Sequence, residues 1–159
     1  MRQPDALVVF SQRPDARVDI DAWNAHATRF FSTRIGLTAD QRFAVGEPVP
    51  RSDAPSFVVT PDNEPPGVRS TFARPTEAED YAAAEMADGR AGGTGLGLLA
   101  RRCPSVWLIV RASDPDPLAL RLAAILASIL LGPIFDPSTG ELFGIKTARA
   151  KILAQITKS

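Results

Sequence analysis

Histidine and cysteine are almost absent from this chain of 159 residues, each occurring once. Because Cys103 is the only cysteine, no intrachain disulfide can form, and a structural zinc site built on several cysteines is excluded. Because His26 is the only histidine, a cluster of histidine ligands is excluded as well. The sequence therefore predicts a fold held together by its own apolar core, without a metal ion or a cofactor.

An excess of charge of either sign is also lacking, since 18 basic side chains balance 18 acidic ones. A neutral chain offers no long-range field to attract nucleic acid or an anionic membrane, and Arg101-Arg102 is its only adjacent basic pair. No apolar run is long enough to span a bilayer, because the longest, 118–131, is interrupted by Arg121 and Ser128. The first residues lack the apolar segment of a signal peptide. These absences favour a cytoplasmic protein with no nucleic-acid or membrane partner.

Length and composition are those of one globular domain. Hydrophobic residues make up 45% of the chain and charged residues 23%, and a chain of this size buries enough surface to fold without a disulfide. We therefore predict a single domain over residues 1–159. Arginine, alanine, glycine and proline are frequent, and all four have GC-rich codons, which favours a bacterial source.

Apolar runs and helix caps predict how strands and helices follow one another along the chain. Short runs of β-prone residues predict strands at 6–10, 56–60, 68–72, 106–110, 134–135 and 142–143. Helical spacing and caps predict helices from residue 20 to near residue 36 and over 76–87, 96–102, 117–131 and 147–156. The expected order is roughly βαβββααβαββα. It indicates an α+β fold with a mixed sheet of about five to seven short strands and helices packed on it.

Three helices carry apolar residues whose placement bears on function. In the first, Trp23, Phe30 and Phe31 recur at helical spacing, so both phenylalanines are expected in the core. The last helix presents Leu153 among its apolar positions. The helix at 118–131 is more apolar than a surface helix, so it is either covered on both sides or meets a partner. We favour burial within the domain.

The segment 46–75 contains seven prolines, which exclude any long helix or strand there. Two short strands still fit, and residues 61–67 between them are typical of a hairpin loop. A surface loop without a hairpin is the alternative.

A glycine-rich loop at 89–97 contains four closely spaced glycines: Gly92, Gly93, Gly95 and Gly97. It resembles the second glycine box of histidine-kinase-type ATP-binding domains, where the backbone approaches the triphosphate. The resemblance covers about seven residues, and Pro104 follows where that family has a long helix. It implies a phosphate site on this loop. The alternative is a turn that joins two helices.

Few residues are left that need a catalytic explanation. Asp116 is expected to cap a helix, and the acidic residues at 77–80 complement the dipole of another. No nucleophile motif surrounds Cys103 or any serine, although a pair between Cys103 and His26 is formally possible. We therefore predict no catalytic residues.

Three functional hypotheses follow. The first is a non-catalytic protein-binding domain, which by fold-level analogy includes bacterial immunity-type proteins that neutralise a cognate toxin. The second is a ligand-binding or nucleotide-binding domain, or an enzyme, that uses the loop at 88–97 with Arg90, Arg101 or Arg102 as anion contacts. The third is a structural homo-oligomer, such as a homodimer, formed through 118–131.

Overall fold

The computed structural model of the chain describes residues 6–38, 55–113 and 115–157. Seven strands are present in these residues: β1 (Ala6–Ser11), β2 (Thr33–Leu37), β3 (Ser56–Pro61), β4 (Gly67–Pro75), β5 (Ser105–Val110), β6 (Ile134–Asp136) and β7 (Glu141–Phe143). The described helices are α1 (Ile20–Phe31), α2 (Ala78–Arg90), α3 (Leu96–Arg101), α4 (Pro117–Leu130) and α5 (Ile145–Thr157). The order of elements along the chain matches the predicted order, although β2 has no counterpart among the strand ranges predicted from the sequence.

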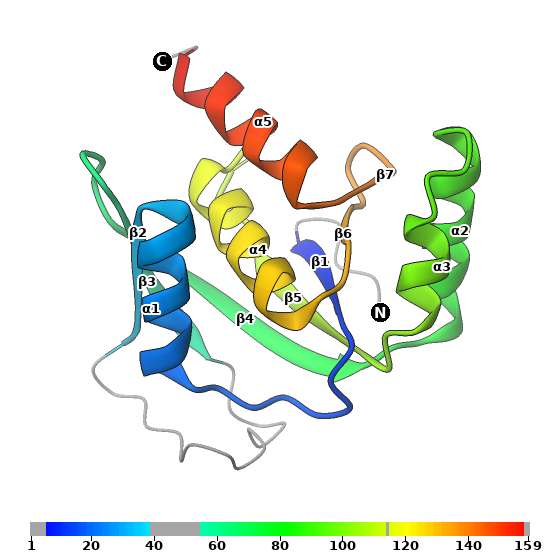
Figure 1. The fold of residues 1–159 in the computed structure, drawn as a ribbon, viewed down its shortest axis with the longest axis horizontal. Helices are drawn as coiled ribbons and strands as arrows, with labels where there is room; N and C mark the ends of the chain where they lie inside the picture. The colour runs from blue at the N-terminus through cyan, green and yellow to red at the C-terminus, as the bar shows by residue number, and fades with distance from the viewer. Residues whose placement is uncertain (1–5, 39–54, 114, 158–159) are drawn as a thin grey trace.

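The seven strands form one sheet in the order β2-β3-β4-β5-β1-β6-β7 (Figure 1). This confirms the α+β class. Every pairing between neighbours is antiparallel, so the expectation of a mixed sheet is corrected. The first strand lies between β5 and β6, which are far along the chain, and the order of elements alone does not specify such a placement.

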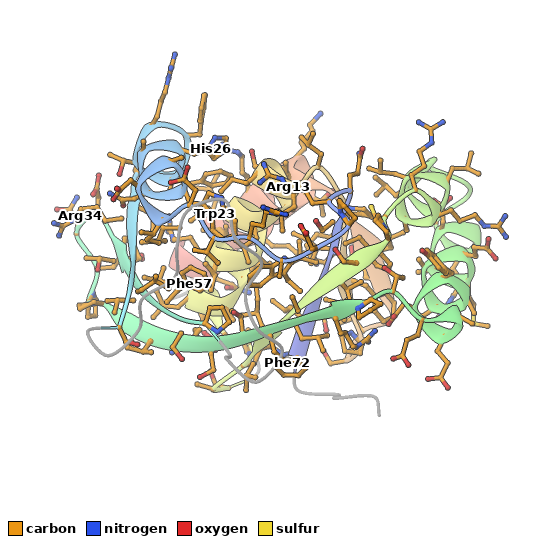
Figure 2. All side chains as sticks on the ribbon, turned by 90° about the horizontal axis from the view of Figure 1, so that it is seen from below. Arg13, Trp23, His26, Arg34, Phe57 and Phe72 are labelled. Atoms are coloured by element: carbon orange, nitrogen blue, oxygen red, sulfur yellow. The ribbon has the colours of Figure 1, made fainter. Side chains whose placement is uncertain are left out.

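Helices cover both faces of the sheet. Side chains alternate along each strand, so Leu7 and Val9 point into a core with α1, α4 and α5, whereas Val8 and Phe10 point towards α2 and α3. Figure 2 shows the same division, with Trp23 and Phe57 on one side of β4 and Phe72 on the other. In Figure 1, α2 and α3 lie side by side at the end of the molecule away from α1.

The apolar helix α4 lies at the centre of the larger core. Asp116 caps it by accepting a hydrogen bond from the amide of Ala119, and Pro117 occupies its first turn, as predicted. Nine of its 14 residues are buried because β1, α1 and α5 all pack against it. The preference for burial within the domain is therefore confirmed.

The first helix ends at Phe31, five residues before the predicted end. Ser32 adopts a left-handed conformation with φ of 49° and terminates the helix. The next residues form β2, an edge strand that sequence reasoning did not locate. Asn24 helps to hold β2 against α1, since its side-chain oxygen accepts a hydrogen bond from the amide of Ile35 at 2.9 Å.

The remaining elements agree closely with the predictions. The hairpin of β3 and β4 is present, and its strands are slightly longer than expected; the prolines at 48 and 50 lie outside the described residues. A capping box of Glu77 and Asp80 begins α2, and the carboxylate of Asp80 accepts hydrogen bonds from Arg74 and from the amide of Glu77. Among the described helices, none combines the length and the apolar character needed to cross a bilayer.

Candidate functional site

The glycine-rich loop joins α2 to α3 and binds a carboxylate of its own chain. Gly92, Gly93 and Gly95 have φ between 79° and 90°, which glycine adopts without strain. The carboxylate of Asp88 accepts hydrogen bonds from the amide and hydroxyl of Thr94, and amides of Gly95 and Gly97 also point to it. These bonds lower the pKa of Asp88.

A phosphate bound to this loop would have to displace Asp88. The arginines proposed as anion contacts are also dispersed, because Arg101 forms an ion pair with Glu85 and Arg90 lies against Gly140 in the β6–β7 turn. Arg102 is exposed at the end of α3. The geometry favours the interpretation as a turn between two helices, and a phosphate site here stays a prediction.

Cys103 and His26 lie in different parts of the fold and do not form a pair. Cys103 is buried in the core under α2 and α3, and burial raises the pKa of its thiol to about 11. A thiol with this pKa is protonated at neutral pH and is a poor nucleophile. His26 lies on α1, on the opposite face of the sheet, and its Nε2 is 2.8 Å from the hydroxyl of Ser128.

The carboxylates of Asp116 and Asp136 form ion pairs that stabilise the fold. Asp116 is buried and forms two hydrogen bonds with Arg69, and Asp136 binds Arg111 at 3.0 Å. Asp114 lies outside the described residues. Over 6–38, 55–113 and 115–157, no group of three or more histidine, cysteine, aspartate or glutamate side chains is arranged to hold a metal ion.

A hollow of about 340 Å³ lies between the C-terminal end of α1, helix α5 and the turn that joins β3 to β4. We name it the α1–α5 hollow. Two of the six exposed large hydrophobic side chains of the described residues line it: Phe30 is 46% exposed and Leu153 is 64% exposed. The full lining comprises Phe30, Phe31, Ser32, Asp62, Arg121, Arg149, Ile152 and Leu153.

Two arginines are held in the wall of the α1–α5 hollow by the last turn of α1. Nη1 of Arg121 donates to the carbonyl of Phe31 at 3.2 Å and to the hydroxyl of Thr33 at 3.1 Å. Arg149 donates to the carbonyl of Phe30 at 2.6 Å, and its guanidinium lies 4.2 Å from the ring centre of Phe31. Such contacts fix the orientation of a guanidinium at a helix C-terminus.

Comparison with known protein families, with characterised proteins and with solved structures finds no match to this chain. Its function must therefore be inferred from its own geometry.

Two other cavities offer less to a partner. One of about 280 Å³ lies beside Arg111 and Asp136, and these two side chains form an ion pair with each other. A wider groove of about 570 Å³ separates α2 from the β6–β7 turn, and Met86 is its one exposed large hydrophobic side chain among the described residues. By comparison, the α1–α5 hollow combines two exposed apolar side chains with two oriented cations.

Sequence reasoning missed the α1–α5 hollow, although two local signals were present. Phe30 and Phe31 are adjacent in a helix and therefore point about 100° apart, so both cannot face one core equally. The structure buries Phe31 and exposes Phe30, which corrects the prediction that both lie in the core. The second signal was Arg121, a cation inside the most apolar helix of the chain.

His26 provides a probe of this region, because it is the only histidine and its ring centre is 4.8 Å from that of Phe30. Burial and the positive charge of Arg149 lower its pKa below 6.5. The folded protein then binds fewer protons than the unfolded chain, so the free energy of unfolding should decrease as pH falls through 6.5 towards the folded pKa.

We expect the substitution Arg149→Met to raise the pKa of His26 towards 6.5, as measured from its single pair of ring proton resonances by NMR. Arg34→Met is the matched control, because Arg34 is an exposed cation on β2 that does not affect this pKa. Equal pKa values in the two variants would contradict the assignment of Arg149 as a neighbour that depresses it.

Proposed function

We propose that this chain is a non-catalytic domain that binds another protein, and that the partner inserts an apolar side chain into the α1–α5 hollow. The observation that carries the proposal is the exposure of Phe30 and Leu153 around one concave site whose wall contains oriented arginines. Aromatic residues and arginine are enriched at protein interfaces, and anchors that fill a pocket supply much of the binding energy.

The surroundings of the α1–α5 hollow support a protein partner over a small molecule. The site opens between two helices and a hairpin turn, so a partner would touch exposed surface on all three. A stable protein complex buries about 800 Å² on each side, which one hollow cannot supply alone. The exposed faces of α1 and α5 beside Phe30 and Leu153 are the surface on which the rest of the contact would form.

We propose a non-catalytic role because the side chains that could act as nucleophile, base or acid have other roles in the fold. The thiol of Cys103 is buried and protonated, the ring of His26 is bonded to Ser128, and Asp116 is bonded to Arg69. Self-association through α4 has less support than the first hypothesis, because α1, α5 and the sheet already cover that helix.

An immunity-type role, in which the partner is a toxin domain, is part of this proposal and rests on fold-level analogy. It places the protein in the cytoplasm of a bacterium, where it would meet the toxin. We expect this chain and such a toxin domain to form a tight one-to-one complex.

The proposal is tested by capture from a lysate of the encoding organism, with quantitative mass spectrometry of the bound proteins. Leu153→Glu places a charge at the rim of the α1–α5 hollow and should reduce capture of the true partner by about tenfold or more. Leu98→Glu is the matched control, because Leu98 is an equally exposed leucine on α3, where it is 69% exposed. A partner that both variants retain equally, or no partner at all, would contradict the proposal.

A further inference from the structure

We infer that the α1–α5 hollow recognises a carboxylate beside the apolar anchor, so that the partner presents an acidic segment. This inference rests on the proposed function and names the chemistry of the partner. It follows from the charges around the hollow and from how each of them is held.

The cations outnumber the anions at this site. Two guanidinium groups, those of Arg121 and Arg149, line its wall, and a third, that of Arg29, lies 5.1 Å from the ring centre of Phe30. Two carboxylates oppose them, Asp62 in the lining and Glu64 beside Arg121. Three positive charges against two negative charges leave a net charge of +1 in and beside the hollow.

The guanidinium of Arg121 is held in an orientation that suits a carboxylate of the partner. Its side chain is only 13% exposed, and its Nη1 is fixed by Phe31 and Thr33. Its Nη2 faces Glu64 at 3.4 Å, a long contact with a carboxylate that is itself 37% exposed. Because this contact is long and Glu64 is partly exposed, it contributes little stability, and a partner carboxylate can replace Glu64 at a small cost.

Arg149 carries a charge that the described residues leave without a carboxylate within 4.0 Å. Its hydrogen bond and its ring contact engage the end of α1, where the helix dipole gives only partial compensation. A guanidinium has five N–H donors, and its flat shape suits two parallel bonds to one carboxylate. With Arg121 in the same wall, the site can bind a carboxylate while the apolar side chain beside it contacts Phe30 and Leu153.

The test uses two short peptides, N-acetyl-Glu-Leu-Glu-amide and its uncharged counterpart N-acetyl-Gln-Leu-Gln-amide, titrated to millimolar concentration against the isotopically labelled chain. We expect the acidic peptide to shift the backbone amide resonances of residues 29–33 and 149–153. Its affinity should exceed that of the uncharged peptide by about tenfold and decrease as salt is added.

Substitutions at the site distinguish an effect of charge on peptide binding from a loss of folding. Arg149→Gln should remove most of the preference for the acidic peptide over the uncharged one. Arg149→Glu should instead bind N-acetyl-Lys-Leu-Lys-amide, which shows that the variant is folded and that the charge decides. Glu64→Gln should strengthen binding of the acidic peptide, since it removes the competing carboxylate.

Equal binding of the acidic and uncharged peptides would overturn the inference, as would the absence of shifts with both. The capture experiment tests the proposed function independently of these peptide titrations. If Leu153→Glu abolishes capture of a partner and Arg149→Gln does not, the α1–α5 hollow binds a protein but does not select a carboxylate.

Discussion

Replacing Gly132 with alanine is expected to destabilise the fold by more than about 3 kcal/mol, beyond the usual range for overpacking. A Cβ atom at this position would lie 2.0 Å from the carbonyl oxygen and 2.5 Å from the carbonyl carbon of Phe10. Both are backbone atoms of β1, and the amide of Phe10 also bonds the carbonyl of Pro133 at 3.0 Å. The contact therefore cannot be relieved by a change of rotamer. The free energy of unfolding in urea measures the effect.

Gly89→Ala is the matched control for this substitution. Gly89 lies in α2, and a Cβ atom there would meet nothing within 4 Å. Alanine is favoured over glycine in a helix by up to about 1 kcal/mol, so this variant should be slightly more stable than the original. If Gly132→Ala retains the original unfolding midpoint, the close approach between the end of α4 and β1 is not as tight as described.

Replacing Asp116 with alanine should cost about 3–5 kcal/mol, as expected when one partner of a buried ion pair is removed. Its side chain is 1% exposed and accepts bonds from Nε and Nη2 of Arg69 and from the amides of Ala112 and Ala119. Alanine would leave the charge of Arg69 buried and the first turn of α4 without its cap. Thermal and urea denaturation of the variant measure the loss.

A second aspartate provides the control. Asp19 caps α1 with one bond to the amide of Ala22 at 3.3 Å and is less buried. Asp19→Ala should therefore cost only about 1 kcal/mol, the usual value of a helix cap. Similar losses in the two variants would show that the pair with Arg69 adds nothing to the cap.

The contribution of Asp116 to the free energy of unfolding should decrease in acid. Burial alone would raise its pKa, but the bonds from Arg69, Ala112 and Ala119 together hold that pKa below the ordinary value of 3.8. Because the folded pKa is lowered, the stabilising contribution is present at neutral pH and is lost as pH falls below the ordinary value. The difference in unfolding free energy between the original chain and Asp116→Ala should therefore shrink in acid.

The central elements of the fold were predictable because their signals are local. The strand β5 is a continuous apolar run, and α4 begins at an aspartate followed by proline, which is a strong start signal. The strand β2 was missed because Thr33–Leu37 is short and directly follows an aromatic helix, so its pattern merged with that of α1. These residues form a strand because they pair with β3, which is distant in the sequence.

The candidate site was less predictable than the fold, because four separate segments form it. Phe30, Asp62, Arg121 and Arg149 come from α1, the β3–β4 turn, α4 and α5, and no spacing in the sequence relates them. The glycine-rich loop had the strongest local pattern, yet the structure shows its amides bonded to Asp88. A motif of backbone donors does not reveal whether the chain itself supplies the anion.

The position of β1 in the middle of the sheet has a consequence for how the protein is made. Ala6 pairs with Val110, more than one hundred residues later, and the other side of the strand pairs with β6. On the ribosome, this apolar strand emerges before both of its neighbours, whereas β2, β3 and β4 can pair as a meander soon after synthesis. Contacts of such long range slow folding. The nascent chain must therefore keep its most buried strand from aggregating until β5 and β6 have been translated.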